Sequence, residues 1–386
     1  MTSTSGDNSS CEGEGNKRVL SIQSHVVSGY VGNKAAVFPL QLLGFDVDII
    51  NSVQFSNHTG YPFGWEGDVL DGSRLEKLVD GMERNGLLSD DDSDSGRIGN
   101  ILTGYIGSES FLSAVVNVVQ KLKGLNPNCR YICDPVLGDM GKFYVPKELV
   151  DIYRREVLPL ADVITPNQFE VEQLTGISIQ TIQDAQRACH ILHDLGVSLV
   201  LITSIVFPDA GSGDCNERSL DTATEQVAPI PNDSISMFAS QRHCSLQHIG
   251  ESGREEDHDT DEQYILHTPR LAGHFTGTGD VSAALFLGWT ADKNPINVDT
   301  ENGGSDLACS LEKLAGTMHA IVQRTANAAA KKQSSSFSST SSSVSVEKAK
   351  IVSSRELQLI QSRDDILHPP RTFRALRVPG NIGKSS

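Results

Sequence analysis

Gly277-Thr278-Gly279-Asp280 is a glycine-rich turn that ends in a lone carboxylate, directly before the apolar run 281–289. Its two glycines allow a tight bend and a close approach of the backbone to an anion. The helix predicted after them would direct its first unpaired N–H groups to the same point. An aspartate beside a phosphate makes chemical sense as a base that accepts a proton from the attacking group. Taken alone, these four residues also fit an aspartate that caps an ordinary helix.

Strands and helices alternate along the chain before this turn. The β-branched run 18–23 predicts the first strand, and the apolar spacing over 32–43 predicts the helix that follows it. Further strands are expected at 45–51, 100–103, 130–133, 162–165 and 198–203, and further helices at 72–85, 108–123, 146–157 and 182–195. This alternation predicts an α/β fold with a mostly parallel sheet covered by helices on both faces.

Polar or flexible residues follow the predicted strands. They are Ser24, residues 51–59, Thr103 to Tyr105, residues 134–139, Thr165 to Asn167 with Glu170, and Thr203 with Ser204. Each one alone also fits a strand-end turn or cap. In parallel sheets, ligands bind beyond the carboxyl ends of the strands. The large number of polar residues expected at this one edge of the sheet therefore predicts a binding site there.

The charge of the chain is concentrated in expected loops. The 386 residues have 38% hydrophobic content, enough for a real core, and a net charge of -17. Segment 209–262 alone carries 13 Asp or Glu against 3 Lys or Arg. This acidity argues against binding to nucleic acid or to an anionic membrane surface.

The seven cysteines are scattered and contain no C-x-x-C pair, which disfavours a disulfide framework and a zinc site. Residues 1–16 lack the apolar core of a secretory signal, and the longest apolar stretch, 197–207, is too short to cross a bilayer. We therefore expect a cytoplasmic protein.

Two acidic inserts and a hairpin are expected in the second half. Residues 209–233 and 245–262 are rich in Gly, Ser, Asp and Glu, whereas 234–241 and 263–271 alternate like the arms of an antiparallel hairpin. The first insert is then a loop before the hairpin, and the second insert is the enlarged tip of the hairpin. We expect both to be solvated loops without a role in the chemistry.

The C-terminal part contains a serine-rich tract, which predicts a disordered linker at 333–346. Past it, apolar spacing predicts a short terminal helix over 354–365. The expected organisation is a disordered tail over 1–17, one domain over 18–332, the linker, and a C-terminal helix and tail over 347–386.

Seven segments carry a family resemblance. They are 19–26 (VLSIQSHV), 29–33 (GYVGN), 51–61 (NSVQFSNHTGY), 102–105 (LTGY), 133–139 (CDPVLGD), 164–170 (ITPNQFE) and 277–280 (GTGD). Together they resemble the pyridoxal kinase family, a branch of the ribokinase-like superfamily. The glycine turn is typical of the whole superfamily, whereas SIQSH and QFSNHTGY are specific to this branch. The resemblance implies a three-layer α/β/α sandwich with the antiparallel hairpin near the nucleotide site.

The resemblance also implies a reaction, the ATP-dependent phosphorylation of the 5′-hydroxyl of pyridoxal, pyridoxine or pyridoxamine. Asp280 is then the base that accepts the proton of the attacking hydroxyl. The N–H groups of Gly277, Thr278 and Gly279 would hold the charge that develops on the transferred phosphoryl group.

For the vitamer, the resemblance implies contacts by Ser24, Val31, Phe55, His58, Thr59 and Tyr105. Ser24 and Thr59 would hydrogen-bond the pyridine ring and its substituents, while Val31, Phe55 and His58 would form walls around it. A packed structural histidine and an ordinary core phenylalanine remain alternatives for His58 and Phe55.

For ATP and its cations, the resemblance implies contacts by Asp134, Asp139, Tyr144, Thr165, Asn167, Glu170, Thr203, Ser204 and Thr278. Asp139 would lie nearer Mg²⁺, and Asp134, Thr165 and Thr203 would lie near a monovalent cation, K⁺ or Na⁺. Tyr144 would contact the nucleotide from a short lid, and the adenine pocket would lie near 271–275. A helix that starts at Pro166 would let Asn167 and Glu170 both face the metal–phosphate cluster.

Two other functions remain open. A hydroxymethylpyrimidine kinase has a similar fold and chemistry, but its ring pocket should lack the pair Ser24 and Thr59 in these contexts. A catalytically silent ligand-binding homologue would be expected to lose one of the acidic or amide residues of the phosphate site, all of which are present. By resemblance, the protein is a homodimer whose ligands are ATP and B6 vitamers.

Overall fold

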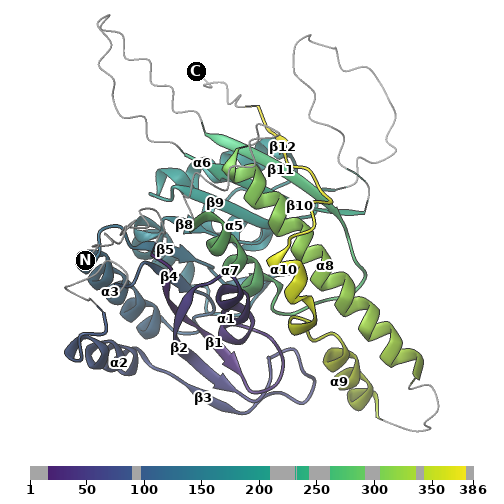
Figure 1. Ribbon diagram of the computed structural model, residues 1–386, viewed down its shortest axis with the longest axis horizontal. Helices are drawn as coiled ribbons and strands as arrows, with labels where there is room; N and C mark the ends of the chain where they lie inside the picture. The colour runs from purple at the N-terminus through teal and green to yellow at the C-terminus, as the bar shows by residue number, and fades with distance from the viewer. Residues whose placement is uncertain are drawn as a thin grey trace, which may run out of the picture.

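The computed structural model describes residues 16–88, 97–208, 231, 233–242, 261–291, 305–335 and 343–379. Their strands form one ten-stranded sheet in the order β12-β11-β10-β9-β8-β5-β4-β1-β2-β3. Figure 1 shows this sheet in the middle of the molecule, with β3 and β12 at opposite edges. None of the described helices is long and apolar enough to span a bilayer.

The central strands run parallel, as the sequence predicts. They are β1 (Arg18–Val26), β2 (Asp46–Phe55), β4 (Asn100–Thr103), β5 (Arg130–Cys133), β8 (Val163–Ile164) and β9 (Leu199–Ile205). Every residue of β4 is buried, as expected of a strand covered on both faces. Their carboxyl ends therefore meet at one edge of the sheet, where the candidate residues gather.

Antiparallel strands complete both sides of the sheet. The predicted hairpin is confirmed, since β10 (Ser234–Gln241) pairs antiparallel with β11 (Glu262–Pro269) along its whole length. Glu262, expected in an insert, belongs to β11; the rest of the inserts lies almost entirely outside the described residues. The short strands β3 (Gly67–Val69) and β12 (Leu376–Arg377) extend the two edges. A separate pair, β6 (Gly138–Asp139) and β7 (Lys142–Phe143), was not predicted.

Five helices share one hydrophobic cluster with one face of the sheet. They are α2 (Gly72–Arg84), α3 (Glu109–Leu125), α4 (Leu149–Ile152), α5 (Gln168–Thr175) and α6 (Ile182–Asp194). The helix expected over 146–157 is shorter than predicted, because α4 continues as a π-helical turn at Tyr153–Val157 and a 3₁₀ turn at Leu158–Leu160.

The other face of the sheet packs against α1 (Asn33–Leu42), α7 (Thr278–Ala291), α8 (Asp306–Ser335) and α10 (Arg363–Leu367). Neighbouring sheet residues such as Leu20 and Val19 belong to the two different clusters, as the alternation of side chains along a strand requires. Figure 1 shows α8, in green, crossing this face beside α7 and α10. The three-layer α/β/α sandwich is confirmed.

The longest helix, α8, has no counterpart among the elements expected from the sequence. Its signal is present, since buried Leu307, Leu311, Leu314, Met318 and Ile321 recur at helical spacing. The helix also runs through Ser335, and α9 spans Val344–Ser354. The linker predicted over 333–346 is therefore wrong at both ends, and only residues 336–342 lie outside the description.

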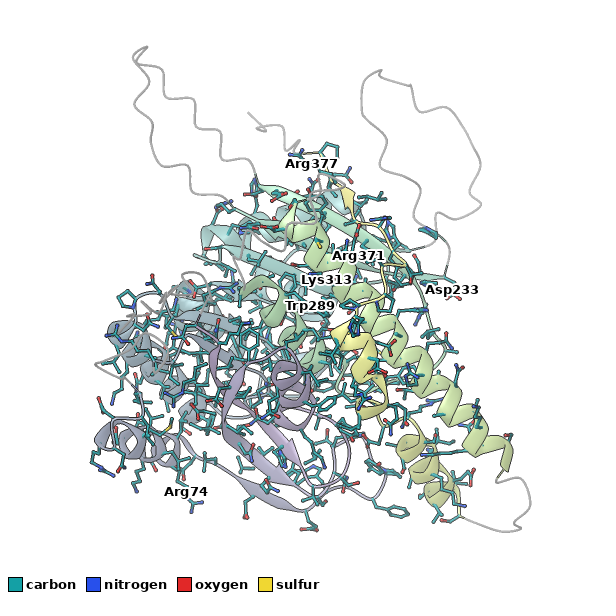
Figure 2. The ribbon with its side chains drawn as sticks, viewed as in Figure 1. Arg74, Asp233, Trp289, Lys313, Arg371 and Arg377 are labelled. Carbon is teal, nitrogen blue, oxygen red and sulfur yellow. The ribbon has the colours of Figure 1, made fainter. Side chains whose placement is uncertain are left out.

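The terminal helix predicted over 354–365 is also wrong. That stretch holds the end of α9, a non-helical segment, a 3₁₀ turn at Ile360–Ser362 and the start of α10. Beyond α10 the chain runs back along α8, where a Cβ on Gly316 would lie 1.7 Å from the Pro370 carbonyl oxygen. Figure 2 shows Lys313 of α8 and Arg371 of this returning segment in the same region. The C-terminal segment is thus built into the domain.

Candidate active site

Ser24 lies inside β1, although the sequence analysis expects it beyond the end of that strand. The pairing of β1 with β2 changes register between Gln23 and His25, an irregularity of the kind that re-aims side chains. Gly32, at a φ of 53°, passes so close that a Cβ there would lie 2.4 Å from Ser24 Oγ. Only glycine fits this contact.

Asp280 lies in the first turn of α7 and is partly buried. Burial raises the pKa of its carboxyl from an ordinary value of 3.8 to about 6, while the nearby backbone N–H groups of Gly32 and of Asp280 itself act in the opposite direction. Gly32 therefore contacts Ser24 on one side and the Asp280 carboxylate on the other. The predicted vitamer contact and the predicted base are brought together.

The glycine turn before α7 is held against the loop that follows β1. Gly277 has a φ of 87°, and a Cβ there would lie 2.0 Å from the Tyr30 carbonyl oxygen. The Gly277 carbonyl accepts the N–H of Val281 at 3.1 Å, so the helix starts directly at the turn. The predicted contacts Thr278 and Gly279 are thereby fixed at a helix N-terminus, which favours an anion.

Val31 and Phe55, two of the three predicted vitamer walls, are buried in a small apolar cluster apart from the two main cores. Tyr105 packs against this cluster and also against the larger main core. The Phe55 ring is stacked on Trp65 at 3.8 Å between centroids. Thr59, by contrast, is exposed. Val31 and Phe55 are thus brought together, while Thr59 lies at the surface.

His58 is buried, with 7% of its surface exposed. The Gly60 N–H donates to its Nδ1 at 3.1 Å, and its Nε2 lies 3.3 Å from Oε1 of Glu356. Glu356 is absent from the residues expected at the site. No spacing pattern connects positions so far apart in the chain.

A cavity of about 570 Å³ opens next to the glycine turn. Five residues expected at the nucleotide line it, namely Asp139, Thr203, Ser204, Thr278 and Gly279. Leu271, Gly273, His274 and Phe275 from the expected adenine pocket line it as well. The residues expected at the phosphates and those expected at the adenine therefore line the same cavity.

The far wall of this cavity comes from α8. Ala315, Met318, His319 and Val322 line it from that helix. None of these four residues is among those expected at the site, because no element is predicted over 306–332. The helical periodicity of α8 is the signal that would have found them.

Asp134 lies under the glycine turn, and only 4% of its surface is exposed. Its Oδ2 lies 3.7 Å from the position of a Cβ built on Gly279. Burial raises the pKa of its carboxyl well above the usual range, and the negative charges of Glu170 and Asp280 add to this. The Thr165 hydroxyl acts in the opposite direction, although no hydrogen bond of ordinary geometry joins the two groups.

Among the described residues, neither Asp134 Oδ2 nor Thr165 Oγ1 has a hydrogen-bond partner, although both are buried. Buried oxygen atoms without a partner are costly unless a ligand satisfies them. A bound cation would satisfy both. Within the same residues, no three His, Cys, Asp or Glu side chains lie close enough to hold a metal by themselves.

Glu170 uses both carboxylate oxygens on backbone N–H groups. Its Oε1 accepts from Leu137 at 3.0 Å and Gly138 at 3.4 Å, and its Oε2 accepts from Asn167 at 2.9 Å. Burial raises the pKa of this carboxyl to about 8, against the effect of these hydrogen bonds. The side chain thus clamps the loop that carries Asp139.

The helix after Pro166 begins later than expected. Asn167 is the N-cap of α5 and forms a reciprocal capping box with Glu170. Its Nδ2 also donates to the Gly138 carbonyl at 2.8 Å. Asn167 and Glu170 therefore face each other and the 137–138 backbone, which corrects the expectation that both point at the metal–phosphate cluster.

Asp139 and Tyr144 lie on the β6–β7 side of the cavity. Asp139 lines the cavity, and its Oδ1 accepts a hydrogen bond from the Met140 N–H at 2.7 Å. This hydrogen bond holds the carboxylate at the cavity wall. Burial raises the pKa of the Tyr144 hydroxyl, and the negative charges of Asp139 and Glu170 raise it further. Tyr144 is nevertheless 52% exposed and does not line the cavity.

Comparison with protein families gives one matching model, described as phosphomethylpyrimidine kinase, over residues 93–228. Among curated proteins, a pyridoxal kinase of Arabidopsis thaliana is 43% identical over 360 residues, 93% of this chain and 94% of that protein. A pyridoxal kinase of Bos taurus is 40% identical over 363 residues, 93% of this chain and 97% of that protein.

Solved structures agree with the sequence relatives. A pyridoxal kinase from Leishmania donovani in complex with ADP and pyridoxine matches with a TM-score of 0.70 and 30% identity. The match covers 94% of this chain and 100% of that one. The complex of the same enzyme with ADP and pyridoxamine matches equally, with a TM-score of 0.70.

Proposed function

The chain belongs to the pyridoxal kinase family, and on that premise it uses ATP to phosphorylate B6 vitamers, with Asp280, we propose, as its general base. The observation that carries the proposal is the shared contact of Gly32 with Ser24 and with the Asp280 carboxylate. A carboxyl group with a pKa raised to about 6 next to the expected vitamer contact supports the role of Asp280 as the proton acceptor. Asp280 then takes the proton as the vitamer oxygen attacks the γ-phosphorus in line, while the bond from that phosphorus to the β–γ bridging oxygen breaks and ADP leaves.

We place the vitamer against the cluster of Val31, Phe55 and Tyr105, with His58 at its side. Ser24 and Thr59 provide the hydrogen bonds that orient its ring. Val31 and Phe55 belong to neither of the two main cores, which supports the assignment, because an ordinary core phenylalanine would have packed into one of them. A flat heteroaromatic ring fits between such apolar walls.

We place ATP in the cavity beside the glycine turn. Its phosphates contact Thr203, Ser204 and Thr278, and the N–H groups of Gly277 to Gly279 stabilise the charge of the transferred group. The adenine lies toward Phe275 and the α8 wall. Tyr144 then has to swing in to reach the nucleotide, as a lid residue would.

The residues present fit the two cations that the family implies. Asp139 at the cavity wall would hold Mg²⁺, which would supply positive charge to stabilise the phosphates. Asp134 and Thr165, whose buried oxygens lack partners, would hold a monovalent cation near Thr203. Glu170 contributes by clamping the loop, since its oxygens are already occupied.

We further propose a cytoplasmic homodimer. The four described cysteines carry free thiols, which supports a reducing compartment. Exposed apolar side chains near the β3 edge, Ile49 at 48% and Val69 at 53%, support an interface there.

A hydroxymethylpyrimidine kinase is the second candidate, because the matching family model carries a pyrimidine kinase description over 93–228. The relatives that match nearly the whole chain are pyridoxal kinases, and they favour the vitamer.

A coupled ATP assay across pyridoxal, pyridoxine, pyridoxamine and hydroxymethylpyrimidine separates the candidates. We expect kcat/KM for at least one B6 vitamer to exceed that for hydroxymethylpyrimidine by about 10²-fold or more, since the site's polar contacts are matched to the pyridine substituents. A preference for hydroxymethylpyrimidine would support the second candidate. Absence of turnover with all four would support a silent homologue.

A further inference from the structure

Glu356 is a partly buried carboxylate from the far end of the chain that reaches the vitamer side of the site. It lies in the non-helical segment after α9, and 15% of its side chain is exposed. Three donors surround it. Its Oε1 accepts from Tyr61 Oη at 3.0 Å and lies 3.3 Å from His58 Nε2, and its Oε2 accepts the Tyr30 N–H at 3.1 Å.

These contacts fix the tautomer of His58. Because the Gly60 N–H donates to Nδ1, that nitrogen is an acceptor and carries no proton. The remaining proton is then on Nε2 and points at the Glu356 carboxylate. Both ring nitrogens are occupied by the protein, so His58 meets a ligand with its ring face and its C–H edge.

The same segment also contacts the catalytic turn. Leu357, fully buried, lies 3.5 Å from the position of a Cβ on Gly277. On the other side, Gly29, at a φ of 100°, lies against the Glu356 carboxylate, since a Cβ there would lie 2.6 Å from its oxygens. Adjacent residues of the C-terminal segment thus contact the vitamer loop and the glycine turn.

We infer that Glu356 is a positioning residue for the vitamer, which holds the His58 ring and the 58–61 loop in the geometry that the vitamer contacts. The inference rests on the proposed placement of the vitamer beside His58. Glu356 does not touch the reacting atoms in this account. Its carboxylate gathers three donors that would otherwise be free to reorient.

The test compares Glu356→Ala and Glu356→Gln with Asp365→Asn. Asp365 is a matched control, because it also ties the C-terminal segment to the domain, through Arg324 of α8 at 2.6 Å, without contacting the predicted vitamer residues. Loss of the charge-assisted hydrogen bond to His58 should raise KM for pyridoxal about 10- to 100-fold in Glu356→Ala. KM for ATP should stay within about twofold. Glu356→Gln, which keeps one acceptor oxygen, should lie in between.

Nitrogen-15 spectra of the ring-labelled histidines report the tautomer of His58. These signals would not change in Glu356→Ala if Glu356 only stabilised the fold. The wild-type His58 signals, assigned by their loss in His58→Asn, should be those of an Nε2–H tautomer. They should shift toward tautomer exchange in Glu356→Ala and stay unchanged in Asp365→Asn. Unchanged tautomer signals in Glu356→Ala would overturn the inference.

Phe55→Ala separates this inference from the placement of the vitamer. If Phe55→Ala raises KM for pyridoxal and Glu356→Ala leaves it within twofold, the positioning role is wrong and the vitamer pocket stands. If neither variant changes KM for pyridoxal, the pocket itself is misplaced and the inference falls with it.

Discussion

At the scale of single residues, the chemistry depends on one carboxylate whose environment makes it a better base than a surface aspartate. Burial shifts the pKa of Asp280 upward to about 6, so that it remains ionised at neutral pH and yet holds a proton more strongly than an exposed aspartate. A catalytic base works best when its pKa lies near the working pH. The backbone N–H groups of Gly32 and Asp280 act against this shift and limit it.

The shift predicts where activity is lost in acid. Because the pKa is raised, the base is protonated as the pH falls through about 6, and kcat/KM should decrease about tenfold per pH unit below that value. The measurement is the pH dependence of kcat/KM with both pyridoxal and pyridoxamine. A decrease in acid that is the same for both substrates is due to a group that titrates on the enzyme. A profile that stays flat down to pH 4.5, in protein shown to be folded there, would assign the chemistry to a carboxyl of ordinary pKa.

At the scale of elements, the site depends on turns that only glycine can make. Gly277 and Gly44 have nearly the same positive φ, 87° and 83°, but only Gly277 has a backbone oxygen within contact distance of a Cβ. A substitution at either position pays a backbone cost of about 1 kcal/mol. At Gly277 the added methyl also pushes the turn away from Tyr30.

The matched pair Gly277→Ala and Gly44→Ala separates these two effects. Both should unfold at a lower temperature, whereas kcat should drop only in Gly277→Ala, by about 10- to 100-fold, because the phosphate-binding turn is displaced. Thermal unfolding and steady-state kinetics on the two variants provide the comparison. Equal activity in both would mean that the close approach to Tyr30 has no role in catalysis.

Elements that depend on their own residues, and not on contacts with distant parts of the chain, are predicted correctly from the sequence. The bounds of β4 and β5 agree with the expectation residue for residue, because each is a short buried run between turns. The continuation of β1 past Gln23 depends on pairing with β2. The local sequence of β1 carries no information about this pairing. The non-helical segment after Ser354 likewise follows from contacts with distant elements, as the hydrogen bond from the Gln358 N–H to Thr325 Oγ1 at 3.0 Å illustrates.

At the scale of the whole molecule, the site draws on three distant parts of the chain. The loop after β1, the turn before α7 and the segment after α9 meet at Tyr30, whose N–H contacts Glu356 and whose carbonyl meets Gly277. The first two carry motifs that a sequence displays. The third carries none, because Glu356 lies 295 residues from its partner Tyr61, and the α8 wall of the cavity was missed with it.

The central claim is that Asp280 accepts the proton of the vitamer hydroxyl, and turnover of Asp280→Asn tests it most directly. The account predicts that kcat for pyridoxal decreases about 10²- to 10⁴-fold while ATP binding, measured by calorimetry, is retained. Because the pKa is raised in the folded protein, the ionised group destabilises the fold at pH 7, so the variant should unfold at an equal or higher temperature. Near-normal turnover in that folded variant would contradict the account.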